Sequence, residues 1–172
     1  MEYIIFDLEA TCWEERSNKM NEIIEIGAVR LDNWLNIAIT FSEFVRPTVN
    51  SKLSDFCTLF TGISQKDVDN AGLFDEVMNN FETWILSSGK KAKLISWGYY
   101  DKKQIIEESA AKNYSGKIIE LLENNHISLK HEFARMRKER SCGMKKALEK
   151  LNLYIEGNHH RGLDDAKNIT KI

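Results

Sequence analysis

The chain opens with the apolar stretch YIIFDLEAT at residues 3–11. Tyr-Ile-Ile-Phe has strong β propensity and precedes two acids spaced by one residue, so the stretch predicts a strand that ends in carboxylates. Alternation along a strand places Asp7 and Glu9 on one face. Since no basic residue flanks them, a divalent cation with a preference for oxygen ligands, Mg²⁺ or Mn²⁺, would offset their charge. The alternative is a solvated strand end without a ligand.

Length and charge bound the class of protein. We expect one domain over residues 1–172, because 172 residues suffice for a single hydrophobic core. The 26 acidic and 24 basic residues give a formal net charge of −2, which argues against a basic scaffold that coats nucleic acid. The three cysteines form no C-x-x-C pair. Without a signal peptide or a run of about 18 apolar residues, we expect a cytoplasmic protein without membrane contact.

Two further strands are expected soon after the first, at Ile23–Leu31 and Ile37–Val45. The connection between them, Asp32–Asn36, is too short for a parallel crossover, so these strands should pair antiparallel. The link over residues 11–22 shows no clear helix, which extends the antiparallel interpretation to the first pair. The sheet is therefore expected to begin with an antiparallel meander of three strands.

Helical periodicity takes over from Asp55 and is clearest over Leu73–Leu86. The later expected elements are a strand at Lys93–Trp97, a helix at Lys102–Lys112, a short strand at Ile127–Leu129, and helices at Glu132–Lys138, Met144–Leu151 and Asp164–Ile172. Three strands followed by alternating helices and strands predict an α/β fold with a mixed five-stranded sheet flanked by helices.

Two later segments also carry groups suited to catalysis. The stretch SWGYYD at residues 96–101 places Asp101 just after a predicted strand, where its alternative role is to cap the following helix. The stretch HHRGLDD at residues 159–165 gathers two imidazoles and two carboxylates at the start of a helix. Its alternative is a surface loop, with Asp164 a favourable charge at a helix start.

In this order, the three segments resemble the DEDD exonucleases with a histidine in the last motif, the DnaQ-like enzymes of RNase H-like fold. The resemblance is strongest to the Eri-type and KapD-like branch of RNA exonucleases, and it covers nearly the whole chain. The stretches that carry it are CWE at 12–14, EIIEIGAV at 22–29, VRP at 45–47, LSDFC at 53–57, LFTGI at 59–63 and GLDDAKNI at 162–169.

The resemblance implies a complete catalytic set. Asp7, Glu9, Asp101 and Asp165 would hold two divalent metal ions, Mg²⁺ or Mn²⁺. The histidine of the last motif corresponds to His160 and not to His159. His160 would act as general base. The implied reaction is hydrolysis from the 3′ end of single-stranded RNA or of RNA 3′ overhangs, releasing nucleoside 5′-monophosphates.

Substrate contacts follow from the same resemblance. Backbone groups at Ala10 and Thr11 would hold the terminal ribose, while Ile63 and Tyr100 would flank the terminal base. Core packing is the alternative for both Ile63 and Tyr100. The basic groups within residues 90–93 and 135–140 would follow phosphates, or else form solvated faces.

Three departures from the family pattern stand out. Tyr99 and Tyr100 occupy positions where many Eri-type relatives carry a Trp before the acid. The chain ends at Ile172, where relatives usually continue the last helix, so truncation is one interpretation. No SAP-like RNA-binding extension precedes the first motif, and the sequence leaves protein partners open.

Two other functions stay open. One is a 3′→5′ DNA exonuclease of the same fold, which would also act on single-stranded DNA, and the other is a catalytically silent nucleic-acid-binding domain. The presence of all five implied catalytic residues favours an active enzyme.

Overall fold

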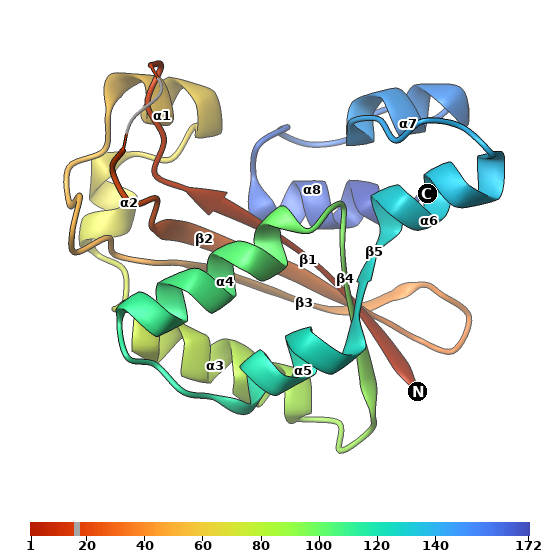
Figure 1. The fold of residues 1–172 in the computed structure, drawn as a ribbon, viewed down its shortest axis with the longest axis horizontal. Helices are drawn as coiled ribbons and strands as arrows, with labels where there is room; N and C mark the ends of the chain where they lie inside the picture. Colours follow the sequence, from red (N-terminus) through yellow and green to blue (C-terminus); the bar gives the residue numbers. More distant parts are fainter. Residues whose placement is uncertain (16–17) are drawn as a thin grey trace.

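A five-stranded mixed sheet organises the computed structural model, which describes residues 1–15 and 18–172 (Figure 1). Its strands are β1 Glu2–Ala10, β2 Ile23–Leu31, β3 Ile37–Phe44, β4 Ala92–Ser96 and β5 His126–Ser128. They lie in the order β3-β2-β1-β4-β5. The pairs β1–β2 and β2–β3 are antiparallel, whereas β1–β4 and β4–β5 are parallel. The predicted antiparallel meander and mixed sheet are therefore confirmed.

The helices occupy the positions expected from the sequence, with ends shifted by a few residues and one addition. They are α1 Asp55–Thr61, α2 Gln65–Asp69, α3 Phe74–Leu86, α4 Tyr100–Ala111, α5 Lys117–Asn125, α6 Leu129–Arg137, α7 Met144–Lys150 and α8 Gly162–Ile169. Helix α5 was not predicted. Among the described residues, no helix has the length and apolar character needed to cross a bilayer.

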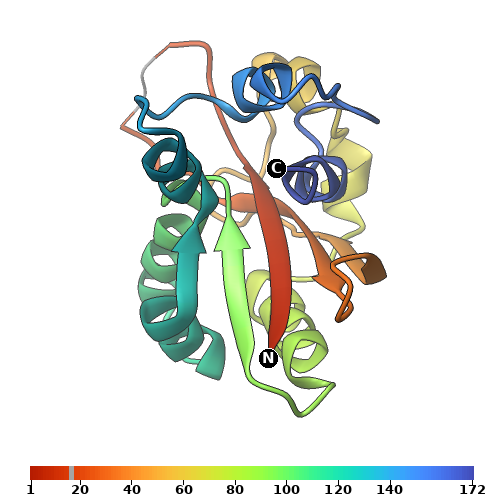
Figure 2. The same cartoon turned by 90° about the vertical axis from the view of Figure 1, so that its right-hand side faces the viewer.

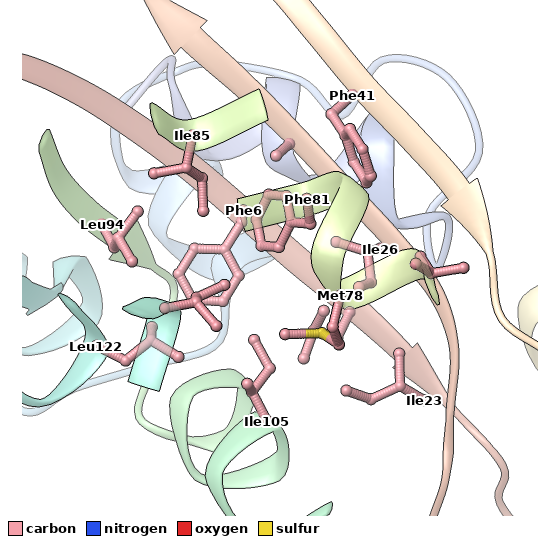
Figure 3. Close-up of a cluster of buried hydrophobic side chains, with 14 of the residues drawn as sticks. Phe6, Ile23, Ile26, Phe41, Met78, Phe81, Ile85, Leu94, Ile105 and Leu122 are labelled. Carbon is pink, nitrogen blue, oxygen red and sulfur yellow. The ribbon is translucent and has the colours of Figure 1, made fainter. Parts of the chain in front are cut away.

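One face of the sheet packs against α3, α4 and α5, which Figure 1 shows together on one side. In the hydrophobic cluster between them, Phe6 of β1 packs against Phe81 of α3, with ring centroids 6.3 Å apart. Ile105 of α4 and Leu122 of α5 belong to the same cluster, as Figure 3 shows. Burial of these apolar side chains fixes the three helices to the sheet.

The opposite face packs against α7 and α8. Because side chains alternate along β1, Ile5 contributes to this second core while Asp7 and Glu9 follow it on the same face. Gly27, directly opposite Asp7 in the β1–β2 register, allows α8 to approach closely. A Cβ atom at Gly27 would lie 2.0 Å from the carbonyl carbon of Gly162. The acids of β1 thus face the first turn of α8.

Candidate metal and catalytic site

The four acids singled out in the sequence line one cavity of about 520 Å³. Asp7 and Glu9 come from β1, Asp101 from the first turn of α4, and Asp165 from the first turn of α8. The carboxylate oxygens of Asp7, Glu9 and Asp165 can all lie within 4.8 Å of one another. The structure therefore brings together acids that are far apart in the sequence.

Parallel pairing explains why Asp101 reaches this cavity. The strands β1 and β4 lie side by side, as Figure 2 shows, and their carboxyl ends meet at one edge of the sheet. The chain leaves β4 there and enters α4, whose N-cap is Tyr99. Asp101 lies inside the first helical turn and is 6% exposed. The alternative that Asp101 is the N-cap residue is therefore wrong.

Burial and mutual repulsion make the ionised form of these acids costly. Burial, with the nearby carboxylates of Asp101 and Glu9, raises the pKa of Asp7 well above its ordinary value. Burial, with Asp165 and Glu25 nearby, raises the pKa of Glu9 to about 8. Burial raises the pKa of Asp101 to about 6. A divalent cation would offset this crowded negative charge, and carboxylate oxygens are the ligands that hard cations prefer.

The two neighbouring histidines make different contacts at the edge of this cavity. His159 Nδ1 lies 3.0 Å from each carboxylate oxygen of Asp165. The His160 ring packs between the rings of His159 and Phe60, with both pairs of centroids 3.9 Å apart. The backbone N–H of His160 donates to Asp165 Oδ2 at 3.0 Å. Thus His159 meets Asp165 through its side chain and His160 donates its backbone N–H, while a ring nitrogen of each histidine lies within 4.8 Å of an Asp165 carboxylate oxygen.

His160 has the electronic character of a base. Partial burial and the neighbouring His159 lower the pKa of His160 from its ordinary value of 6.5, and the charge of Asp165 only partly opposes this. The neutral ring can accept a proton near pH 7. His160 also has a φ of 65°, an uncommon backbone conformation for a residue with a side chain.

The predicted substrate-binding residues do not all reach the cavity. Tyr100 lines it and is 52% exposed. Ala10 and Thr11 are not among its lining residues, and the Thr11 hydroxyl accepts a hydrogen bond from the Glu22 N–H at 2.9 Å. Ile63 is 0% exposed and belongs to a separate buried cluster. The contacts of Ala10, Thr11 and Ile63 with substrate stay predictions.

Several residues at or next to the cavity were not predicted from the sequence. Tyr99 and His131 stack with ring centroids 4.7 Å apart, and both line the cavity together with Lys130. Phe60, 45% exposed, packs on His160 from α1. The available signals were the position of Tyr99 beside the second acid and that of Phe60 beside the Thr-Gly-Ile motif. Nothing in the sequence pattern pointed to His131.

Solved structures share this architecture. The nuclease domain of 3′hExo, described as a DEDDh family member bound to rAMP, has a TM-score of 0.90 and 30% identity to this chain. The match covers 99% of this chain and 88% of that one. Exonuclease I matches with a TM-score of 0.74 at 10% identity, covering 99% of this chain and 42% of that one, which shows the fold alone. The predicted RNase H-like exonuclease fold is confirmed.

Curated proteins give a consistent picture. Human 3′-5′ exoribonuclease 1 is 34% identical over 180 residues, covering 98% of this chain and 50% of that protein. The 3′-5′ exonuclease Snipper of Drosophila melanogaster is 31% identical, covering 96% of this chain and 66% of that protein. The chain thus spans about half the length of the first of these relatives. An exonuclease family model, RNase_T, matches residues 4–172, so this chain belongs to the exonuclease family.

Proposed function

We propose that this chain is a metal-dependent 3′→5′ exoribonuclease that releases nucleoside 5′-monophosphates from single-stranded RNA or 3′ overhangs. The observation that carries the proposal is the convergence of Asp7, Glu9 and Asp165 within 4.8 Å. Asp101 and His160 line the same cavity. The exoribonuclease names of the curated relatives support RNA as the substrate.

The proposal includes two divalent ions, Mg²⁺ or Mn²⁺. Asp7, Glu9, Asp101 and Asp165 would hold them through carboxylate oxygens, the ligand type both ions favour. When bound, such ions stabilise the attacking and leaving oxygens of an in-line displacement at phosphorus. The raised pKa values of Asp7 and Glu9 support this assignment, because a cation would favour their ionised forms.

His160 is the proposed general base, which accepts a proton from the attacking water. Its lowered pKa keeps the ring neutral and able to accept that proton. The rings of Phe60 and His159 restrict the orientation of the imidazole. His159 is not the proposed base, because its Nδ1 already lies 3.0 Å from the Asp165 carboxylate.

The aromatic lining of the cavity suits a single strand. Tyr99, Tyr100 and His131 present rings near the acids, and Lys130 adds a positive charge. Stacking on aromatic rings tolerates any base, because every base has a π face. Phosphates on the same strand would be attracted to Lys130. One structural neighbour is described as recognising the 3′ end of a histone mRNA stem-loop. For this chain we propose binding of an RNA 3′ end, without the stem-loop.

The direct test compares RNA and DNA of equal length, each single-stranded and labelled at its 5′ end. Each is incubated with the protein in Mg²⁺ or Mn²⁺, with and without a chelator. We expect a ladder that shortens RNA one nucleotide at a time and disappears with chelator. Faster degradation of DNA would instead favour a DNA exonuclease, and the absence of cleavage would favour a binding domain.

A further inference from the structure

Glu25 is a buried acid next to the carboxylate cluster that the proposed chemistry leaves without a role. It lies on β2 directly opposite Glu9 of β1. Its side chain is 1% exposed, and Glu25 is not among the residues that line the cavity. Like charges opposite each other on neighbouring strands are destabilising, so a buried Glu25 needs its own compensation.

Two consecutive residues of the histidine loop, residues 159–165, provide that compensation. Glu25 Oε1 accepts a hydrogen bond from Arg161 Nη2 at 3.0 Å, and Oε2 accepts one from Arg161 Nε at 3.1 Å. Oε2 also accepts the backbone N–H of Gly162 at 3.0 Å. The bidentate carboxylate–guanidinium pair fixes direction as well as distance. Since Gly162 is the first residue of α8, the carboxylate also interacts favourably with the helix dipole.

The contacts of Glu25 with Arg161 and Gly162, here called the anchor, lie in the sequence between His160, the proposed base, and Asp165, a proposed metal ligand. His160 immediately precedes Arg161, and the Asp165 N–H donates to the Arg161 carbonyl at 2.8 Å. The left-handed backbone of His160, with a φ of 65°, is strained and persists only when its surroundings hold it. An anchor at Arg161 and Gly162 supplies such a constraint on both sides of the helix start.

Two further packing contacts lie at the same place. The Arg161 guanidinium lies over the Phe44 ring, 5.3 Å from its centroid. Gly27, two residues along β2 from Glu25, meets the backbone of Gly162 without an intervening side chain. The start of α8 is thus held to β2 by charge, by hydrogen bonds and by close backbone packing.

We infer that Glu25 is a positioning residue that acts through Arg161 and Gly162 to hold His160 and Asp165 against β1. The inference rests on the proposed function, because it concerns the geometry of the proposed base and of one proposed metal ligand. Residues that orient metal ligands or catalytic groups typically change metal affinity or activity by about 10- to 100-fold when they are replaced.

The test uses the double variant Glu25→Gln/Arg161→Gln, which keeps the net charge of the chain. Its matched control is Glu2→Gln/Arg30→Gln, which removes a 3.5 Å ion pair between Glu2 of β1 and Arg30 of β2, at the end of these strands away from the cavity. We expect kcat on single-stranded RNA to fall about 10- to 100-fold in the first variant, with KM changed less than about twofold. The control should keep the wild-type kcat in its folded fraction.

A second readout does not depend on activity. Amide hydrogen exchange of the metal-free protein should accelerate over residues 159–165 in the Glu25→Gln/Arg161→Gln variant and stay unchanged there in the control. If wild type failed to degrade RNA, the proposed function would fail, whereas exchange would still test the anchor. Wild-type kcat with unchanged exchange in the double variant would overturn the inference.

A milder variant covers the case in which the double variant does not fold. Arg161→Lys keeps the positive charge but loses the bidentate geometry with Glu25. We expect it to lower kcat by several-fold and to speed exchange at Gly162. A folded Arg161→Lys protein with wild-type values of both quantities would overturn the inference.

Discussion

At the scale of single residues, two adjacent imidazoles are distinguished by their contacts. His160 packs between two rings, whereas His159 is directed at Asp165. We therefore expect His160→Ala to lower turnover by about 10²- to 10⁴-fold, the range typical of a lost general base. The measurement is single-turnover cleavage of RNA at saturating protein.

His159→Ala is the matched variant for this prediction. It removes a neighbouring ring of the same chemistry and should lower turnover much less than His160→Ala. A larger loss in His159→Ala than in His160→Ala would contradict the assignment of His160 as the general base.

Glu22, the residue before β2, is a buried acid that holds the segment following β3. Its carboxylate accepts backbone N–H groups from Thr48, Val49 and Asn50, and it pairs with Lys112 Nζ at 3.0 Å. Burial alone would raise the pKa of Glu22, but these hydrogen bonds outweigh it and lower the pKa below the ordinary 4.5. Glu22 therefore stabilises the fold in its ionised form.

The lowered pKa sets the pH at which this stability is lost. As pH falls below about 4.5, the unfolded chain takes up a proton at Glu22 before the folded chain does, so the contribution declines as pH drops through the folded pKa. We expect Glu22→Gln to lower the free energy of unfolding by about 3 kcal/mol at pH 7 and by less at pH 4. Urea unfolding measures both values. The control is Glu107→Gln, at an exposed pair with Lys103, which should change the free energy of unfolding by no more than about 0.5 kcal/mol at either pH. An equal loss at both pH values in Glu22→Gln would contradict the account.

At the scale of elements, α8 depends on its close approach to β2. A Cβ atom at Gly27 would come within 2.0 Å of backbone atoms of both Gly162 and Leu163, which no side-chain rotation relieves. We expect Gly27→Ala to lower the free energy of unfolding by about 3 kcal/mol or more and to reduce activity, because α8 carries Asp165. Thermal or urea unfolding gives the first value.

Gly143→Ala is the control for this substitution. Gly143 is the N-cap of α7, with a φ of −66°, and a Cβ atom there meets nothing within 4 Å. The change should cost about 1 kcal/mol or less. Equal stability of Gly27→Ala and wild type would show that α8 does not need this contact.

Sequence periodicity predicted the long helices better than the short ones. Helix α3 has thirteen residues with apolar side chains at helical spacing, so its position was predicted. Helix α5 has nine residues and buries only Ile118 and Leu122, a pattern too short to stand out. The helix start at Tyr100 was misplaced because the favourable N-cap type at Asp101 suggested a later start.

At the scale of the molecule, the site depends on contacts that local sequence does not contain. Alternation placed Asp7 and Glu9 on one face, and the parallel β1–β4 pair then brought Asp101 beside them. By contrast, Glu25 and Arg161 are 136 positions apart, and no periodicity relates them. Only the packed structure shows that this pair holds the histidine loop.

The net charge of −2 is compatible with nucleic-acid hydrolysis once the placement of the acids is known. Four of the acids lie around one cavity, where two divalent ions would offset their charge. An enzyme that holds only the end of a strand does not need a basic surface of the kind that coats nucleic acid.

The most direct test of the central claim is the fate of 5′-labelled single-stranded RNA with wild type and with Asp7→Asn. Asn retains the size of Asp7 but removes the charge at the centre of the carboxylate cluster. In Mg²⁺ or Mn²⁺, wild type should produce a ladder of single-nucleotide steps and nucleoside 5′-monophosphates. A folded Asp7→Asn protein should produce neither, since it would not hold the ions. Wild-type rates from folded Asp7→Asn would contradict the account.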